Sequence, residues 1–341
     1  MTCVAAVDSG GTHTNVRVVD VDTREAVTFE LDRSLTSNRT NAELSELLMR
    51  LMSAVTTNDL GQPSAMWVSA AGYAAPTRSR LEKLFRAAAG DFSGPVGLAN
   101  DAVSLLLAHE PGVVAVVAGT GSVAMARTSE GNVIVRGGDE WVVADYGSAF
   151  WLGLNGVRAA YQALEGAAET ALLGCLIEHY KPLRSDEDED PRETVSEIAR
   201  DLARAGTNTK PVIASFARQV TRQAELGDEP AQRIVRAAVD DLAAAAARVY
   251  RQLNSRVPDQ DLLPRFVVSG SVAFNSRYYS ESFTAALDQF LFDVRESLGS
   301  PIDVSYQLNG IGEGIELAER LLTATEISDL DPSHPYSLLR F

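Results

Sequence analysis

Cysteine is scarce in this chain of 341 residues, which contains only Cys3 and Cys175. The two lie far apart in the sequence, and neither belongs to a Cys-x-x-Cys pair or to a Cys/His pattern with the spacing of metal ligands. This argues against a zinc site or an iron–sulfur cluster held within one chain. The four histidines have no paired spacing either, and we interpret the two cysteines as reduced, buried thiols.

Basic residues are outnumbered, because Lys and Arg total 30 against 46 Asp and Glu and the net charge is −16. An extended surface for the phosphate backbone of a nucleic acid would need the opposite sign, so we expect no nucleic-acid partner. The charge does not exclude ATP, since a bound nucleotide is held locally by backbone N–H groups and metal.

Long apolar runs are also missing. No stretch approaches the roughly 20 residues that span a bilayer, and no basic segment followed by an apolar one opens the chain, since Asp8 and Gly10-Gly11 interrupt it. We therefore expect no membrane partner and a cytoplasmic location. Hydrophobic residues still make up 45% of the sequence, which at this length is enough for a sizeable core and two domains.

Two common nucleotide-binding signatures are absent. The sequence contains no GxxxxGK[ST] motif, and neither of its two glycine-rich turns is followed by a helix, as the dinucleotide-binding fingerprint requires. Both turns lead into β-rich segments instead. A nucleotide site in this chain must therefore be of another kind.

The first of these turns lies close to the N-terminus. An apolar run, Val4 to Val7, leads through Asp8 into Ser9-Gly10-Gly11-Thr12, and a second β-rich run, Val16 to Val21, leaves the turn. Adjacent glycines let backbone N–H groups crowd an anion, and Asp8 at the strand end can reach a hydrated Mg²⁺. An ordinary Gly-Gly hairpin turn explains this stretch alone equally well.

The same pattern recurs near residue 120. The β-branched run 113–118 enters Gly119-Thr120-Gly121-Ser122, a strand emerges from that turn, and a polar turn leads to another strand. We interpret the recurrence as a diverged internal duplication. Two phosphate-sized turns facing one another would make a cleft, so the repeat favours phosphate binding over a plain hairpin turn.

Apolar periodicity along the rest of the chain alternates between strands and helices, which indicates an α/β architecture. We expect strands at 26–31, 66–71, 96–99, 113–118, 123–127, 133–136, 265–269 and 302–307, and helices at 42–56, 77–89, 102–109, 211–225, 229–253, 280–297 and 312–323. A polar tail that we expect to be loosely held ends the chain.

Five short motifs occur in the order seen in the sugar-kinase, Hsp70 and actin superfamily. They are Asp8-Ser9-Gly10-Gly11-Thr12, Asn100-Asp101, Gly119-Thr120-Gly121-Ser122, Asp145-Tyr146-Gly147-Ser148 and Ser269-Gly270-Ser271-Val272. More narrowly, the chain resembles the N-acetylglucosamine kinase and BadF/BadG-type ATPase family over roughly residues 4 to 320. Each motif is weak alone, and the five in order with suitable spacing are strong together.

The resemblance implies ATP and Mg²⁺ as cofactors and an α/β fold of two ribonuclease-H-like lobes. Each lobe would have a mixed five-stranded sheet, with ATP in the interdomain cleft and a helix-rich C-terminal lobe. We place the N-terminal lobe at 1–115, the C-terminal lobe at 116–304, a segment packing back on the N-terminal lobe at 305–326 and a tail at 327–341. Because relatives are dimers, the resemblance also implies a homodimer.

The resemblance carries ligand roles onto three segments. Asp8 would reach Mg²⁺ through water, the second turn would bind the transferring phosphoryl group, and the third segment would line the adenosine pocket. The implied ATP and phosphate ligands are Asp8, Gly10, Gly11, Thr12, Thr14, Gly119, Thr120, Gly121, Ser122, Gly270 and Ser271. The implied sugar ligands are Asn38, Asn100, Thr120, Gly138, Asp139 and Asp145.

Asp101 is the candidate catalytic base. A sugar hydroxyl must lose its proton as it attacks the γ-phosphoryl group, and a fixed carboxylate within hydrogen-bond reach supplies roughly 10²- to 10⁴-fold. The alternative is that Asp101 only caps the helix that begins at Ala102. Its place between the two phosphate turns favours catalysis, with Asn100 supplying the cap or orienting the base.

The chain departs from the family between residues 137 and 148. Relatives carry Gly-Trp-Gly and then Gly-Asp-Glu-Gly-Ser, whereas here Asp139 replaces the tryptophan and Tyr146 replaces the glutamate. Because that tryptophan lies against the sugar in the family, the change concerns the substrate more than the chemistry. An acidic Asp139-Glu140 pair facing the pocket would favour glucosamine over N-acetylglucosamine. Solvated turn carboxylates are the alternative.

The function implied is an ATP- and Mg²⁺-dependent kinase acting on a hydroxyl of an amino sugar, N-acetylglucosamine or glucosamine. One alternative is an ATPase that activates a radical acyl-CoA enzyme, which would need paired cysteines for a [4Fe–4S] cluster that this chain lacks. The other is a sugar- or nucleotide-sensing regulator without turnover. Repressors of this fold carry an N-terminal helix-turn-helix, whereas here the phosphate strand begins at residue 4.

Overall fold

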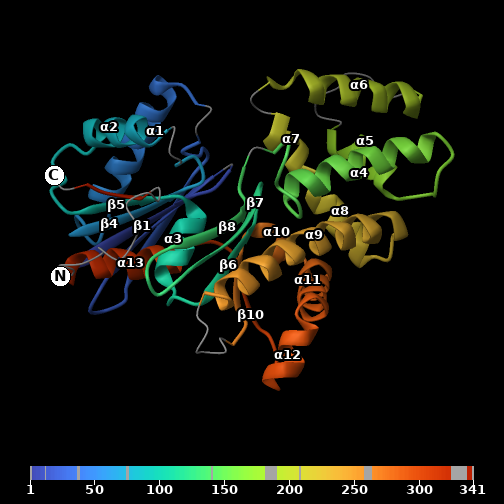
Figure 1. The fold of residues 1–341 in the computed structure, drawn as a ribbon. Coiled ribbons are helices and arrows are strands. Elements are labelled where there is room, and N and C mark those ends of the chain that lie inside the picture. The colour runs from blue at the N-terminus through green and yellow to red at the C-terminus, as the bar shows by residue number, and fades with distance from the viewer. Residues whose placement is uncertain are drawn as a thin grey trace. The chain divides into compact units, whose positions relative to one another are not determined.

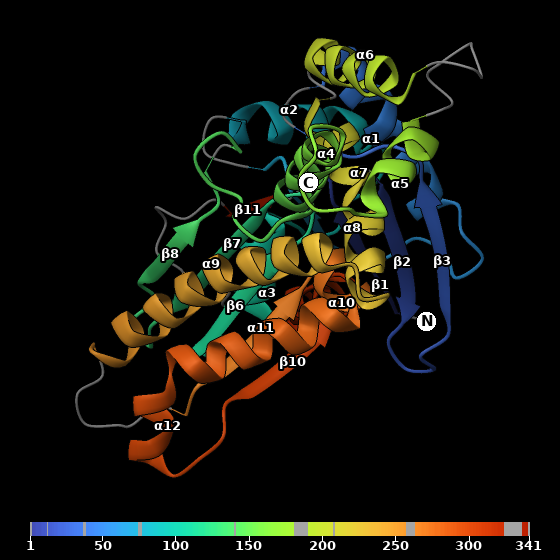
Figure 2. The ribbon, with the colours of Figure 1, turned by 90° about the vertical axis from the view of Figure 1, so that its right-hand side faces the viewer.

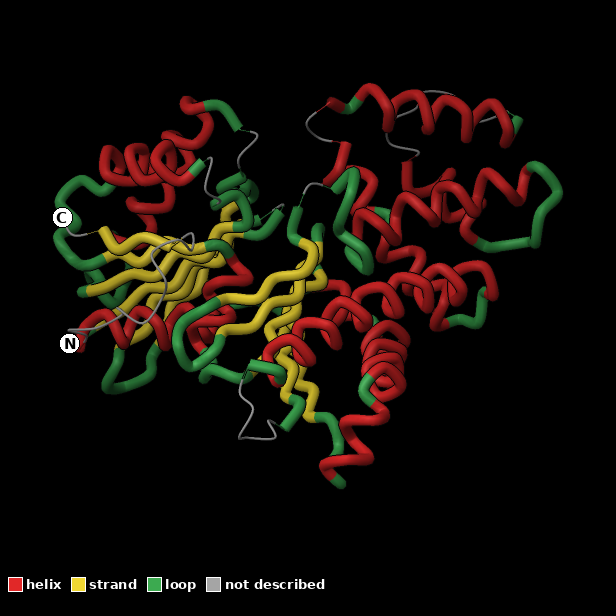
Figure 3. The backbone as a smooth tube through the Cα atoms, in the orientation of Figure 1, coloured by secondary structure: helices red, strands yellow, loops and turns green. Residues whose placement is uncertain are grey.

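The computed structural model describes residues 2–11, 13–36, 39–73, 77–139, 141–180, 190–206, 209–256, 263–323 and 336–339. The chain divides into two compact units (Figure 1). Unit 1 comprises 1–115, 126–133 and 309–341, and unit 2 comprises 116–125 and 134–308. Each unit is built around its own β-sheet with helices packed on it (Figure 3). Among the described helices, none combines the length and apolar character needed to cross a bilayer.

Unit 1 contains a mixed six-stranded sheet in the order β11-β5-β4-β1-β2-β3. Its strands are β1 (Cys3–Ser9), β2 (Thr14–Asp20), β3 (Ala26–Leu31), β4 (Ala65–Ala70), β5 (Val96–Ala99) and β11 (Tyr336–Leu339). Strand β1 pairs antiparallel with β2 and parallel with β4, and β2 pairs antiparallel with β3. The N-terminal hairpin and its third strand are therefore confirmed.

The edge strand β11 corrects the expectation of five strands and a loosely held tail. It pairs antiparallel with β5, with Leu338 opposite Gly97 and Leu339 opposite Val96. Leu339 is only 2% exposed and belongs to the hydrophobic core of the unit. A four-residue strand carries too little periodicity to be recognised locally, and its partner lies in a distant part of the sequence.

Helices cover both faces of the unit 1 sheet (Figure 1). On one face, Val7 and Val68 join the core formed with the buried leucines of α1 (Asn41–Thr56), and α2 (Arg78–Ala88) contributes Phe85. On the other face lie α3 (Asp101–Ala108) and α13 (Ile311–Thr323). Here Trp67 Nε1 donates a hydrogen bond of 2.9 Å to Ser104 Oγ. Because side chains alternate along a strand, β1 and β4 direct some of their side chains toward the layer of α1 and α2 and the others toward the layer of α3 and α13.

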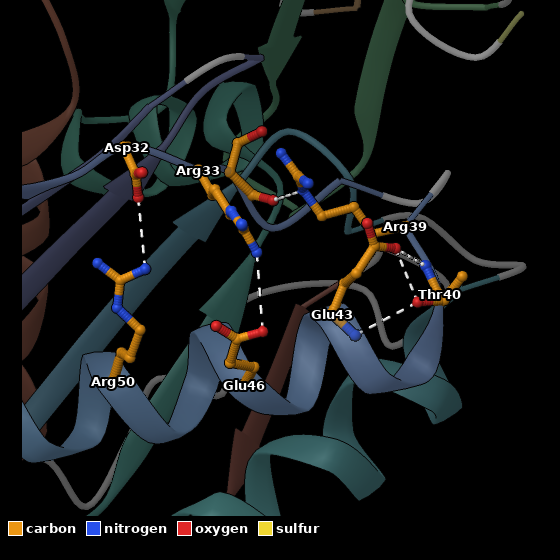
Figure 4. A network of polar contacts seen from close by, with 8 residues as sticks. Asp32, Arg33, Arg39, Thr40, Glu43, Glu46 and Arg50 are labelled. Atoms are coloured by element: carbon orange, nitrogen blue, oxygen red, sulfur yellow. Dashed lines mark hydrogen bonds and ion pairs between the residues drawn. The ribbon is translucent and has the colours of Figure 1, made fainter.

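The start of α1 is fixed by a polar network (Figure 4). The Glu43 N–H donates to Thr40 Oγ1 at 3.3 Å, and the Thr40 N–H donates to Glu43 Oε2 at 2.8 Å. This reciprocal pair is a capping box, which satisfies backbone donors that the first helical turn leaves without partners. Arg39 Nε donates to the Ser34 carbonyl at 2.8 Å. These contacts anchor both ends of the connection between β3 and α1.

The second sheet, most of whose residues belong to unit 2, has five strands in the order β10-β9-β6-β7-β8. Its strands are β6 (Val113–Ala118), β7 (Ser122–Arg127), β8 (Val133–Gly137), β9 (Arg265–Ser269) and β10 (Asp303–Gln307). Strands β9 and β10 are parallel, and β6 and β7 are joined by the second glycine turn. The bounds of β6 and β9 match those expected from their apolar, β-branched runs.

The helices of unit 2 are α4 (Ala149–Leu164), α5 (Leu172–Tyr180), α6 (Pro191–Arg204), α7 (Thr209–Ser215), α8 (Ala217–Glu225), α9 (Glu229–Asn254), α10 (Ser271–Asn275), α11 (Arg277–Phe290) and α12 (Phe292–Leu298). The long α9 lies beside α11 (Figure 2). The single helix expected at 280–297 is wrong, because the backbone leaves the helical region at the fully buried Leu291.

Candidate functional site

The first glycine turn is held by buried hydroxyl groups at its two ends. The hydroxyls of Ser9 and Thr14 lie 2.9 Å apart, and Thr14 Oγ1 donates to the Arg33 carbonyl at 2.7 Å. The Leu35 N–H donates to Ser9 Oγ at 2.7 Å. The Thr14 hydroxyl is therefore committed to the fold of unit 1, and it shapes the turn by holding the ends of β1 and β2 together.

The space beside Gly10 in this turn is free of described atoms. A Cβ built on Gly10 would meet no described atom within 4 Å, and the Gly11 carbonyl accepts a hydrogen bond of 3.0 Å from Ser34 Oγ. The Gly10 N–H donates to the His13 carbonyl at 3.1 Å, so this amide is used within the turn, and no side chain fills the space beside Gly10 where the sequence predicts a phosphate. Thr12, together with Asn38 of the proposed sugar ligands and the neighbouring Glu140, lies outside the described residues.

The order of the strands in unit 1 brings Asp8 and Asp101 to the same end of the sheet. Parallel pairing places Asp8 of β1 opposite Ser69 of β4, and Ser69 opposite Ala99 of β5. The Asn100-Asp101 pair follows directly after Ala99. Because β1, β4 and β5 are parallel, their C-terminal ends lie at the same end of the sheet, and Asp8 and Asp101 converge there. Open α/β sheets bind ligands at this end.

Asp8 is a buried carboxyl group in an acidic neighbourhood. Its side chain is 8% exposed. The pKa of Asp8 is raised to about 7. Burial is the largest cause, and the negative charges of Asp101 and Glu313 act in the same direction. A hydrogen bond from the Gly310 N–H acts in the opposite direction and is outweighed. The Asp8 carboxyl group is therefore stabilised either by binding a proton or by a nearby cation.

Asn100, rather than Asp101, is the N-cap of α3. Its side chain accepts a hydrogen bond of 3.0 Å from the Ala102 N–H, and its backbone is extended. Asp101 is the first helical residue, one position before the expected start, and its Oδ1 also accepts from the Ala102 N–H, at 2.9 Å. The half-buried carboxylate of Asp101 therefore lies at the positive end of the helix dipole with a fixed orientation.

The second glycine turn, in unit 2, is bound to the 145–147 segment. The Ser122 N–H donates to Asp145 Oδ1 at 2.9 Å, and Ser122 Oγ donates to the Tyr146 carbonyl at 2.6 Å. A Cβ on Gly121 would lie 2.7 Å from the same Asp145 oxygen. Glycine is therefore required at this position because the Asp145 carboxylate occupies the space of a side chain.

Asp145 is also paired with a lysine that the sequence analysis missed. Lys210 Nζ, from α7, lies 2.6 Å from Asp145 Oδ2, and Asp145 is 3% exposed. The surroundings of Lys210 in the sequence match none of the five motifs, and its partner lies far earlier in the chain. No local sequence signal identifies this pair, because folding alone brings α7 to the second turn.

The third glycine segment meets the second turn inside unit 2. Gly270 has a φ of +120°, and a Cβ there would lie 2.4 Å from the Ala118 carbonyl oxygen. Its N–H donates to the Gln307 carbonyl at 3.2 Å. Ser271 follows as the exposed first residue of α10. Only a glycine lets the chain pass this close to the end of β6.

The remaining proposed sugar ligands lie in both units. In unit 2, Gly138 and Asp139 are exposed, and the Gly138 N–H donates to the Ser122 carbonyl at 3.1 Å. Gly119 and Thr120 are half-buried at the second turn. In unit 1, Asn100 Nδ2 donates to the Ala71 carbonyl at 3.4 Å. The second turn thus gathers most of the proposed ligands that belong to unit 2.

Structural comparison places the fold among sugar kinases. A candidate N-acetylglucosamine kinase from Porphyromonas gingivalis matches with a TM-score of 0.65 and 16% identity, covering 93% of this chain and 98% of that one. A ROK family glucokinase from Streptomyces griseus in complex with glucose and AMPPNP matches with a TM-score of 0.54 and 18% identity, covering 94% and 100%. The predicted architecture of two ribonuclease-H-like lobes is confirmed.

Sequence comparison defines the family within that fold. The BadF/BadG/BcrA/BcrD ATPase family matches residues 6–293. This chain belongs to that family, as its motifs predicted. The N-acetylmuramic acid/N-acetylglucosamine kinase of Clostridium acetobutylicum is 25% identical over an alignment of 296 residues that covers 84% of this chain and 91% of the relative.

Proposed function

We propose that this chain is an ATP- and Mg²⁺-dependent kinase that phosphorylates a hydroxyl of an amino sugar, with Asp101 as general base. The observation that carries the proposal is the convergence of Asp8 and Asp101 beside an open glycine turn in unit 1. Membership of an ATPase family supports ATP as the phosphoryl donor. The relative named as a kinase of two N-acetylated amino sugars supports the class of acceptor.

Asp8 would hold the metal through water. Its buried carboxyl group, with a pKa raised to about 7 by burial and by neighbouring negative charges, fits a cation that offsets both effects. Within the described residues, no group of three His, Cys, Asp or Glu side chains is arranged to hold a metal directly. When bound, Mg²⁺ supplies positive charge to the phosphate oxygens.

The glycine turns would bind the phosphates and the nucleoside. Gly10, Gly11 and Thr14 form or support the first turn, and Gly119, Thr120, Gly121 and Ser122 form the second. Thr12, which lies outside the described residues, is a further proposed ligand of the phosphates. Gly270 and Ser271 would line the adenosine pocket, because the glycine brings the backbone close without a side chain. The N–H groups of Gly10, Gly119 and Ser122 already donate within the protein, so other backbone N–H groups of the turns, rather than basic side chains, would bind the nucleotide.

Asp101 would accept the proton of the attacking hydroxyl. As the sugar oxygen forms its bond to the γ-phosphorus, the bond from that phosphorus to the leaving ADP oxygen breaks and the proton passes to the carboxylate. The hydrogen bond from the Ala102 N–H to Oδ1 orients the group, and Asn100 caps the helix beside it. Geometry of this kind lets a carboxylate act from a fixed position.

The sugar would contact Asn38, Asn100, Thr120, Gly138, Asp139 and Asp145. Asp139 is exposed and follows two glycines with positive φ angles, so its carboxylate lies on a tightly turned segment. A negative charge there favours a protonated amine at the sugar. We therefore propose glucosamine as a substrate alongside N-acetylglucosamine, in a cytoplasmic homodimer. Light scattering and cell fractionation would test the homodimer and the location.

One assay tests the proposed function directly. ADP release is measured with Mg-ATP and a panel of hexoses, hexosamines and N-acetylhexosamines, for the wild type and for Asp101→Asn. We expect turnover stimulated by an amino sugar and lost in the variant. Nucleotide binding without stimulation by any sugar would point instead to a sensing protein.

A further inference from the structure

One carboxylate in unit 2 joins a lysine to the backbone of the second glycine turn. Oδ2 of Asp145 lies 2.6 Å from Lys210 Nζ, and Oδ1 accepts the Ser122 N–H at 2.9 Å. Lys210 belongs to α7, a helix that contains none of the five superfamily motifs. The lysine is therefore connected to the turn through a single side chain.

Asp145 is held in an unfavourable place. Its φ is +65°, in the left-handed region that residues other than glycine rarely adopt, and its side chain is 3% exposed. A buried carboxylate needs partners for its charge, and a strained backbone persists only where its surroundings hold it. Lys210 supplies the charge, and Ser122 supplies a backbone donor. Loss of the lysine would leave a buried charge beside the turn.

The segment around Asp145 is in close contact with the turn and with Tyr279. Ser122 donates its hydroxyl to the Tyr146 carbonyl at 2.6 Å, and the Tyr279 hydroxyl fixes the Gly147 carbonyl at 2.7 Å. Gly121 has no side chain that would separate the turn from Asp145. Because the contacts are this close, we expect a shift of the Asp145 carboxylate to move the backbone N–H of Ser122.

We propose that Lys210 is a positioning residue for phosphoryl transfer. By fixing the charge and orientation of Asp145, it holds the second glycine turn in the arrangement that the reaction requires. This inference rests on the proposed kinase function for its catalytic consequence. Its structural part, the control of the turn by Lys210, stands independently of the reaction. The residue acts through Asp145 and not on the substrate itself.

Three variants test the proposal kinetically. Lys210→Met removes the charge, Lys210→Arg keeps it, and the double variant Lys210→Met with Asp145→Asn removes both charges of the pair. We expect Lys210→Met to lower kcat by about 10- to 100-fold while KM for ATP changes by less than about 3-fold, because misplacement of a group affects the transition state most. Lys210→Arg should restore most of the rate. Because Asp145 is also a proposed sugar ligand, Asp145→Asn alone is the reference for the double variant, and the two should have the same kcat, since Lys210 acts through Asp145.

The control is Arg295→Met, which removes another ion pair of unit 2, in which Arg295 Nη1 lies 2.6 Å from Asp288 Oδ2. Active molecules are counted by nucleotide titration, and unfolding is followed in urea. If Lys210 is only structural, Lys210→Met lowers the folded fraction while kcat per active molecule stays within about 2-fold of the wild type, and the proposal is overturned. Equal losses of kcat in Arg295→Met would overturn it as well.

Hydrogen exchange separates this inference from the kinase proposal. We expect the Ser122 amide to exchange faster in Lys210→Met than in the wild type, and to be unchanged in Arg295→Met, because its acceptor is Asp145. If the wild type phosphorylates no sugar but this acceleration is observed, the kinase proposal fails and the control of the turn by Lys210 is supported. Unchanged exchange at Ser122 in Lys210→Met would overturn the inference.

Discussion

The negative charge of Asp101 raises the pKa of Asp8 across the end of the unit 1 sheet, in addition to the larger effect of burial. The two residues follow strands β5 and β1, which are separated in the sheet by β4. Their proximity concentrates negative charge beside the first glycine turn. Such a site binds protons or metal ions more readily than an isolated surface carboxylate does.

The raised pKa of Asp8 makes stability depend on pH. The pKa of this carboxyl group is raised to about 7 in the folded protein, against an ordinary value of 3.8 for an aspartic acid. Its protonated form therefore stabilises the fold fully below about pH 4, and this contribution is lost as the pH rises through 7. In metal-free urea unfolding, we expect the stability of the wild type relative to Asp8→Asn to fall by at most about 4 kcal/mol from pH 4 to pH 8. A constant difference would contradict the assignment.

Metal binding should show the opposite dependence on pH. Because Mg²⁺ and a proton compete for Asp8, the affinity of the wild type for Mg-ADP should increase as the pH passes through about 7. Asp8→Asn should lack this increase and should bind Mg-ADP more weakly. The affinity of both proteins for Mg-ADP is measured by calorimetry between pH 6 and 8. Protonation of the nucleotide affects both proteins equally, so the difference between their affinities isolates the contribution of Asp8. Parallel curves for the two proteins would argue against Asp8 as the metal residue.

Replacement of Asp101 by asparagine should remove the base while preserving the fold. We expect kcat to fall by roughly 10²- to 10⁴-fold and the affinity for nucleotide to change little. The loss of its charge should also lower the pKa of Asp8, which moves the pH dependence of stability to lower pH. Asp91→Asn, at an exposed carboxylate of the same unit, is the control and should retain activity. Full activity in Asp101→Asn would exclude the residue as base.

Two glycine substitutions should have opposite effects on stability. Gly270→Ala places a methyl group 2.4 Å from the Ala118 carbonyl at a φ of +120°, and we expect a loss of about 2–4 kcal/mol. Gly174→Ala, on the exposed side of α5 with no described atom within 4 Å of its Cβ position, should stabilise by about 0.5–1 kcal/mol. Urea unfolding measures both. A tolerated alanine at residue 270 would show that the close approach of Gly270 to β6 is not required.

Asp139 should influence the choice of acceptor. If its carboxylate faces a protonated amine, Asp139→Asn lowers the ratio of kcat/KM for glucosamine to that for N-acetylglucosamine. Because Asp139 is exposed, solvent screens the charge, and we expect a change of no more than about 5-fold. The measurement is a comparison of both sugars with both proteins. A wild type that prefers N-acetylglucosamine would remove the argument for a cationic substrate.

Much of the fold was determined by local sequence. Local patterns predict several elements, because burial of one face imposes a fixed period on the chain. The alternation in 3–20 predicts β1 and β2, the leucine spacing predicts α1, and the β-branched runs at 113–118 and 265–269 predict β6 and β9. The glycine turns and the Asn100-Asp101 pair were also identified in advance, since their composition and order are visible in the sequence. The family follows from these motifs.

Only the tertiary structure decided how distant segments meet. The pairing of β11 with β5, the helix break at Leu291 and the Lys210–Asp145 ion pair all depend on contacts between residues far apart in the sequence or on burial. The pKa of Asp8 likewise depends on Asp101, Gly310 and Glu313, which the fold gathers around it. The sequence by itself therefore determined the elements, the family and the candidate residues. Long-range packing decided their partners and their charge states, because periodicity acts along the chain and electrostatics acts through space.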